Sequence, residues 1–174
     1  MTIRSLISGV FVLVAATTVA QSQQPNQIGS FREWNAYTFT SAEAKACFVA
    51  SQPTGSKYSQ NISGRDSVFL FVTMWVASDP TKSIQNEVSA IIGYPFKPES
   101  NVTADIDGKK FSMFTRADNA WFNDRNSEAT FIEAMKAGNT MTIQGSSGRG
   151  TVTTDTYSLS GVTAALEAIT KACP

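Results

Sequence analysis

The sequence contains no histidine, only two cysteines and no excess of charge of either sign. Without histidine, neither a Ser-His-Asp nor a Cys-His nucleophile can form, and the commonest side-chain ligand for metals is missing. Zinc would need Asp and Glu ligands together with both cysteines, which is poor zinc chemistry. The 14 basic and 14 acidic residues leave no basic surplus for nucleic acid. We therefore expect no metal, no cofactor and no nucleic-acid partner.

Long apolar runs are also scarce, and the clearest one lies near the N-terminus. Residues 6–16 are apolar over about the length of a signal-peptide core, and the small residues 18–20 resemble a cleavage site. The run is too short to cross a bilayer. We expect a signal peptide at 1–20, a flexible lead-in at 21–30 and a single β-rich domain at 31–174, with no transmembrane segment in the mature chain. A periplasmic or secreted protein of the cell envelope is predicted.

The two cysteines, Cys47 and Cys173, lie near opposite ends of this domain. An even pair in an exported chain is typical of a disulfide, which would stabilise the fold by up to about 5 kcal/mol in the chain-entropy model. Free thiols or a redox site are the alternative. The missing C-x-x-C spacing and the penultimate position of Cys173 favour the structural bridge.

Short extended segments dominate from residue 31 onward. Asp107-Gly108 favours a type I′ turn and hence a β-hairpin, whereas residues 51–66 and 118–126 are rich in polar loop formers. The pattern predicts a mainly β fold, an antiparallel β-sandwich or barrel-like domain of about eight strands. The expected strands are 31–39, 45–50, 67–76, 86–92, 101–106, 109–114, 140–144 and 151–159.

Two short helices are expected late in the chain. Asn126 or Ser127 can cap the first, which ends at Gly138. Ser160 can cap the second, near the C-terminus. One apolar stripe of the second helix should be buried, and its members are Val162, Leu166, Ile169 and Cys173.

The most apolar segment of the domain is residues 67–76, and both of its faces are apolar. This pattern predicts a central strand that is covered on both sides. An aromatic ligand platform formed by Phe69, Phe71 and Trp75 is the alternative. Core packing is favoured because large aromatic side chains are more often buried than functional.

Asp155 alternates onto the same face as Tyr157 and Leu159. If this face points inward, Asp155 is a buried carboxylate and needs donors, for which Arg149, a lysine, tyrosine hydroxyls or loop amides are available. No partner base stands beside Asp155, so we expect Asp155 and Tyr157 to form a structural polar anchor and expect no catalytic residue.

A set of aromatic residues in loops and strand ends could form an interaction surface with the Arg149 guanidinium, which lies at a glycine-flanked loop tip. A solvated hairpin loop is the alternative for Arg149. The expected members of the surface are Tyr94, Phe96, Trp121, Phe122 and Arg149.

Several segments resemble the invasion-associated locus B family. They are residues 86–96, the Asp107-Gly108 hairpin, Ala120-Trp121, residues 134–138, and the closing block 148–161 with Cys173. The resemblance covers nearly all of residues 31–174. It implies a small exported β-rich protein of alphaproteobacteria, periplasmic or envelope-associated, in a family named for host-cell entry. It implies no catalytic residue.

Together these observations predict a non-enzymatic binding or interaction module of the cell envelope, associated through its family with host-cell invasion, whose partner is an unknown envelope or host protein. An exported hydrolase that uses carboxylates or a Ser–Lys pair is one alternative. A structural envelope-stress protein without a ligand is another. An exposed apolar or aromatic patch would favour the binding module, and two close carboxylates with raised pKa values would favour the hydrolase.

Overall fold

The computed structural model describes residues 24–41 and 44–174. The expected signal peptide at 1–20 therefore lies outside the described residues. Within them the chain forms eleven strands, two α-helices and one short 3-10 helix, η1 (Pro80–Lys82). The strands are β1 (Asn26–Phe31), β2 (Trp34–Thr40), β3 (Ala44–Ser51), β4 (Gly55–Tyr58), β5 (Phe69–Ala77), β6 (Ile84–Ile91), β7 (Asn101–Ile106), β8 (Lys109–Arg116), β9 (Asn119–Trp121), β10 (Thr140–Ser146) and β11 (Val152–Ser158). The helices are α1 (Arg125–Ala137) and α2 (Val162–Ala172).

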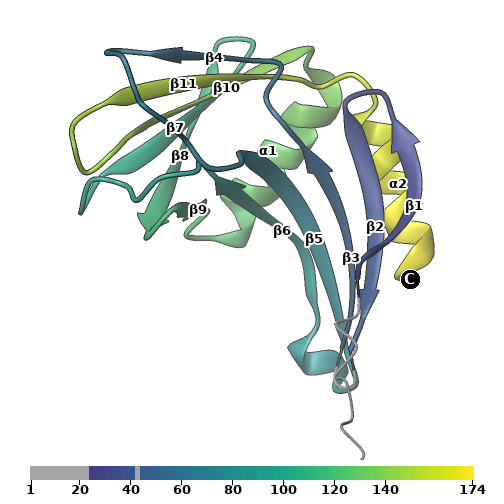
Figure 1. Cartoon of the computed structure of the whole chain (residues 1–174). Coiled ribbons are helices and arrows are strands. Elements are labelled where there is room, and N and C mark those ends of the chain that lie inside the picture. The colour runs from purple at the N-terminus through teal and green to yellow at the C-terminus, as the bar shows by residue number, and fades with distance from the viewer. Residues whose placement is uncertain (1–23, 42–43) are drawn as a thin grey trace, which may run out of the picture.

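All these strands join one antiparallel sheet in the order β1-β2-β3-β5-β6-β9-β8-β7-β10-β11-β4. Figure 1 shows that this sheet is strongly bent, with α2 alongside β1 and β2. The sheet does not close, because β1 and β4 remain its two edges. A mainly β, sandwich-like fold with two helices, one of them C-terminal, is confirmed.

Three strands exceed the predicted eight: β1, β4 and β9. They form inside segments that were predicted to be a lead-in or loops. The prediction of a flexible lead-in at 21–30 is therefore wrong for the residues that belong to β1. These strands are short and mostly polar, and they lack the alternating apolar pattern that marks a strand in a sequence. Backbone pairing to β2, β11, β6 and β8 defines them instead.

The hydrophobic core lies on the inner face of the bent sheet. Residues of both halves of the sheet and of both helices form one buried cluster. Trp34 links the two halves of the sheet. Its side chain on β2 is fully buried, and its indole N–H donates a hydrogen bond to the Ser158 carbonyl of β11 at 3.0 Å. The predicted stripe of α2 is buried as expected, from Val162 to Cys173.

The helix starts differ from the prediction. Asp124, and not Asn126 or Ser127, caps α1, because its side chain accepts a hydrogen bond from the Ser127 amide. Gly161, and not Ser160, occupies the N-cap position of α2. Gly161 has a positive φ of 93°, and an added Cβ would lie 2.1 Å from the Phe31 carbonyl oxygen, so only glycine fits this close approach.

The predicted hairpin and disulfide are both confirmed. Asp107 and Gly108 have positive φ angles of 48° and 94° between β7 and β8. Cys47 on β3 is bonded to Cys173 at the end of α2, with a Cα–Cα distance of 6.0 Å. Lys45 adds a second link between the same two elements, because its ammonium donates to the Ala172 carbonyl. No helix within the described residues is long and apolar enough to span a membrane.

We expect Cys47→Ala and Cys173→Ala to lower the melting temperature by at least several degrees, because each removes a bridge between residues 126 positions apart. The double variant should melt close to either single variant, since one substitution already opens the bridge. Thermal unfolding followed by circular dichroism measures this effect. Unchanged melting of all three variants would show that the bridge does not stabilise the fold.

Candidate functional site

One face of the sheet carries a row of aromatic side chains that point away from the core. We call this row the outer aromatic strip, and its members are Tyr37, Phe48, Phe69, Phe71 and Trp75. They alternate along β2, β3 and β5 with fully buried residues such as Ala36, Val49 and Val72. They therefore lie on the face opposite to the one that packs against α2.

Four rings of the strip, those of Tyr37, Phe48, Phe69 and Phe71, contact one another. The Tyr37 and Phe48 rings are stacked with centroids 5.1 Å apart, and Phe71 lies 6.0 Å from Phe48 and 5.5 Å from Phe69. The strip is thus an ordered surface whose side chains restrict one another across three strands.

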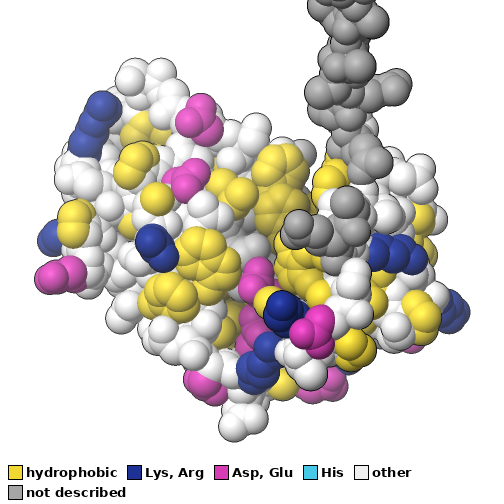
Figure 2. Space-filling view, turned by 90° about the horizontal axis from the view of Figure 1, so that it is seen from below, with side chains coloured by type: hydrophobic (Ala, Val, Ile, Leu, Met, Phe, Trp, Pro, Cys, Tyr) yellow, Lys and Arg dark blue, Asp and Glu magenta, His cyan; other side chains and the backbone are white. Residues whose placement is uncertain are grey.

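The sequence predicts that both faces of residues 67–76 are covered, but the face that belongs to the strip is partly exposed. The strand β5 is interior, with β3 and β6 on its two sides, but Trp75 is 38% exposed, and Phe69 and Phe71 are only half-buried. The expectation that both faces of this strand are core is therefore wrong. Both helices pack against the inner face, so no helix within residues 24–41 and 44–174 covers the outer face. Figure 2 shows hydrophobic side chains gathered on both sides of a hollow, with acidic and basic side chains beside them.

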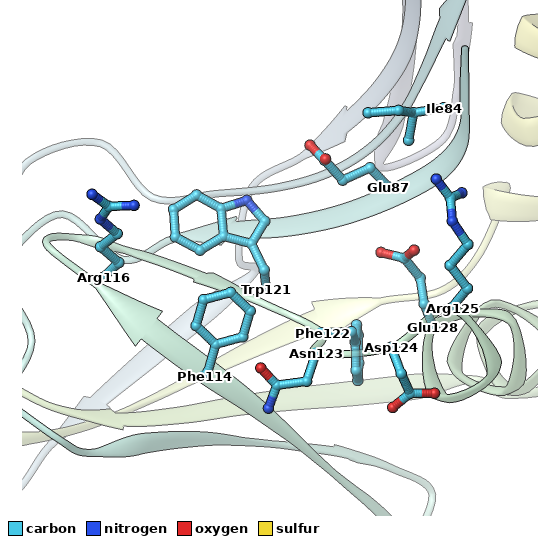
Figure 3. Close-up of a pocket in the computed structure, with 10 residues that line it drawn as sticks. All are labelled: Ile84, Glu87, Phe114, Arg116, Trp121, Phe122, Asn123, Asp124, Arg125 and Glu128. Carbon is cyan, nitrogen blue, oxygen red and sulfur yellow. The ribbon is translucent and has the colours of Figure 1, made fainter. Parts of the chain in front are cut away.

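A groove of about 410 Å³ continues this outer face past β6. We call it the β6–β8–α1 groove (Figure 3). Its lining residues are Ile84, Glu87, Phe114, Arg116, Trp121, Phe122, Asn123, Asp124, Arg125 and Glu128. The Phe114 and Trp121 rings, which are partners across β8 and β9, form its aromatic wall with centroids 5.7 Å apart and planes 30° apart.

Two acidic residues of the groove also serve the fold. Glu128 accepts a hydrogen bond from the Val88 amide at 2.6 Å and so attaches α1 to β6. Burial raises the pKa of the Glu128 carboxyl, and the nearby Glu87 charge adds to the increase, whereas the Val88 amide opposes it. Asp124 caps α1, and the hydrogen bonds from Ser127 lower the pKa of the Asp124 carboxyl.

Four other polar side chains in the groove have no such structural task. Glu87, Arg116, Asn123 and Arg125 form no hydrogen bond or ion pair with other side chains or backbone groups in the described part of the chain. Figure 3 shows Arg116 on one side of Trp121 and Glu87 on the other. These donors and acceptors are available to a ligand.

A second cavity, of about 650 Å³, lies beside a buried ion pair. The Arg65 guanidinium donates two hydrogen bonds to the Asp155 carboxylate, both at 2.6 Å, and a third to the Ile92 carbonyl. The side chain of Arg65 is 6% exposed and that of Asp155 is fully buried. The rings of Tyr58 and Tyr94 lie near the guanidinium, at 5.9 and 5.2 Å from its central carbon.

The partners of Asp155 differ from those that the sequence offered. They are Arg65 and the Ser56 hydroxyl, which donates at 2.6 Å, and not Arg149, a lysine or a tyrosine. Tyr157 is buried next to this network, yet its hydroxyl forms no hydrogen bond within the described residues. Burial raises the pKa of Tyr157, and the charge of Asp155 adds to the increase. The hydrogen-bonded anchor therefore joins Arg65, Ser56 and Asp155, without Tyr157.

The five residues of the expected interaction surface do not come together. Trp121 and Phe122 line the β6–β8–α1 groove, although Phe122 also packs against Phe131 of the core. Tyr94 and Arg149 line the second cavity, where the Tyr94 hydroxyl bonds to Thr153 at 2.7 Å. Phe96 is 7% exposed and belongs to the core, so its place on a surface is wrong.

Sequence reasoning missed Phe114, Glu87, Arg116 and Arg125 as groove residues. The available signal was the period of two in β8, which places Phe114 and Arg116 on one face. The meeting of this face with Glu87 of β6 depends on β9, which was predicted to be loop. In the described part of the chain, no three acidic or cysteine side chains are grouped closely enough to hold a metal ion.

Asp155→Asn should lower the free energy of unfolding by about 3–5 kcal/mol, because it leaves the buried Arg65 guanidinium without its countercharge. Asp124→Asn should change it little, since asparagine is also a good helix cap. The double variant Arg65→Met with Asp155→Leu should be less destabilised than Asp155→Asn alone. Equal effects of the two Asn variants in urea denaturation would place Asp155 outside the structural network.

Glu128→Gln should change how stability depends on pH. Because the pKa of Glu128 is raised in the folded state, its favourable contribution is complete below the ordinary value of 4.5 and is lost as pH rises through the folded-state pKa. The variant should therefore gain stability relative to the wild type as pH rises through this interval. Glu167→Gln, at an exposed position on α2, is the control for the same change of side chain. Urea denaturation at a series of pH values measures both, and parallel curves for wild type and Glu128→Gln would contradict the expectation.

Comparison with known proteins gives one match. The family described as Invasion associated locus B (IalB) protein matches residues 34–170. This match covers most of the chain and leaves out only the two ends of the described residues. No curated protein and no solved structure matches the chain. The matched region contains β2 to β11 and nearly all of α2. The chain therefore belongs to the invasion associated locus B family.

Proposed function

We propose that this protein is exported and acts as a non-enzymatic binding module of the cell envelope, with an envelope or host protein as its partner. Family membership supports an invasion-associated envelope role at the level of the family. The Cys47–Cys173 disulfide supports an oxidising compartment. The pattern of residues 1–20 supports export.

The observation that carries the binding role is the outer aromatic strip. Its large side chains span three neighbouring strands, and four of them order one another through ring contacts. They are not packed against the core cluster, and Trp75 is 38% exposed. Burying such a contiguous apolar surface against a partner is favourable at about 25 cal/mol per Å² of apolar area. The strip itself carries no charged side chain, which favours an apolar protein surface as its partner.

The alternatives explain less of the structure. The proposal of a structural envelope protein without a ligand does not account for the outward-facing aromatic strip, of which Trp75 is 38% exposed. A carboxylate hydrolase is favoured by one observation, that Glu87 and Glu128 line the same groove and that the Glu87 charge adds to the raised pKa of Glu128. However, the resolved electrostatic effect is only that of the Glu87 charge on Glu128, and the Glu128 carboxylate already binds the Val88 amide and holds α1 in place. We therefore rank the hydrolase second.

A photoreactive phenylalanine analogue at Phe71 should crosslink a discrete partner in intact envelopes. The same analogue at Thr163, an exposed position on α2 of the opposite face, should not. Phe48→Ser, which removes a ring 6.0 Å from Phe71, should reduce the Phe71 product by about tenfold while the protein remains folded. Immunoblotting of the crosslinked species measures the yield.

Identical products from Phe71 and Thr163 would argue against a specific surface. A Phe71 product that is insensitive to Phe48→Ser would do the same. Retention of the wild-type circular dichroism spectrum by the Phe48→Ser variant serves as the control for folding.

A further inference from the structure

The β6–β8–α1 groove has the composition of a ligand site that is distinct from the outer aromatic strip. Its volume of about 410 Å³ lies in the range of small-molecule sites. We propose that this groove binds a neutral oligosaccharide, with one sugar ring stacked on the wall formed by Phe114 and Trp121. This inference does not depend on whether the strip binds a protein.

The first argument is the aromatic wall. Trp121 and Phe114 are half-exposed on the outer face, and their planes differ by only 30°. Together they offer a broad and nearly continuous ring surface, as Figure 3 shows. The axial C–H groups on one face of a pyranose carry partial positive charge, and they complement the negative face of an aromatic ring. An apolar ligand would also fit this wall, so the polar rim decides the class.

The second argument is the polar rim. Glu87 offers carboxylate acceptors, Arg116 and Arg125 offer guanidinium donors, and Asn123 offers both. None of these four side chains is engaged by a hydrogen bond or ion pair with the described residues. A hydroxyl group both donates and accepts, so a row of sugar hydroxyls can bind carboxylates and guanidinium groups alike.

The third argument is charge. Three carboxylates and two guanidinium groups line the groove, and the two signs are interspersed. A phosphate- or sulfate-rich ligand would face Glu87, Asp124 and Glu128, and a polycationic ligand would face Arg116 and Arg125. Because the positive and negative side chains of the groove nearly balance, we expect its ligand to be polar but to carry no net charge.

The fourth argument separates a glycan from an extended peptide. Peptides commonly bind a sheet by pairing with a free strand edge. The edge of β6 beside the groove is partly occupied, because β9 pairs with residues 89–91 and the adjacent Val88 amide already donates to the Glu128 carboxylate. Side chains therefore offer most of the contacts in the groove, which suits a sugar ring.

The test uses the purified protein and a panel of neutral tetrasaccharides of glucose, mannose, galactose and N-acetylglucosamine. Saturation-transfer NMR and isothermal titration calorimetry should detect saturable binding of at least one of them. Trp121→Ala should weaken this binding by about tenfold or more, which is typical of an aromatic anchor. Glu87→Gln, a nearly isosteric change at a side chain that forms no hydrogen bond or ion pair with the described residues, should weaken it by several-fold.

Trp75→Ala is the matched control, because it removes an exposed tryptophan that belongs to the outer aromatic strip and does not line the groove. It should leave oligosaccharide affinity unchanged, so a failure of the strip proposal and a failure of this one can be told apart. The glycan site would be overturned by the absence of binding to the whole panel, by binding that Trp121→Ala and Glu87→Gln do not affect, or by binding only of heparin or of a peptide library in place of the neutral sugars.

Discussion

The two faces of the bent sheet differ, because α1 and α2 pack on one face and not on the other. The positions of the core, the aromatic strip and the groove all depend on this difference. Successive side chains of a strand point to opposite faces, so every strand that contributes to the core also presents residues outward. Both helices pack on the inner face. Neither α1 nor α2 covers the aromatic side chains on the outer face of β2, β3 and β5, and the same face continues across β6, β9 and β8 into the groove.

Two long-range links keep this arrangement in place. The disulfide and Lys45 attach the end of α2 to β3, and thereby fix the helix on the inner face. The ion pair between Arg65 and Asp155 ties the loop after β4 to β11, and the third hydrogen bond of Arg65 reaches the end of β6. A buried pair of this kind adds little net stability compared with apolar residues, but the loss of either member is costly.

The sequence predicted the local features that depend on neighbouring residues. The hairpin at Asp107-Gly108, the buried stripe of α2 and the strands with clear alternation all follow from short-range patterns. Edge and bridging strands escaped prediction, because β1, β4 and β9 are defined by their pairing partners and not by their own residues. The groove could not be predicted for the same reason, since β9 is the strand that joins β6 to β8.

Composition alone determined that histidine-based catalysis is excluded, and the cysteine positions pointed to the bridge that the structure contains. Only the tertiary structure decided which aromatic residues are core and which are surface. Phe96 and Phe71 look alike in the sequence, yet Phe96 is buried beside Gly145, whereas Phe71 points away from the helices. The physical reason is that alternation assigns a residue to one of two faces, but it does not say which face the helices will cover. The partner of Asp155 was likewise decided by the fold, because 90 residues separate it from Arg65 along the chain.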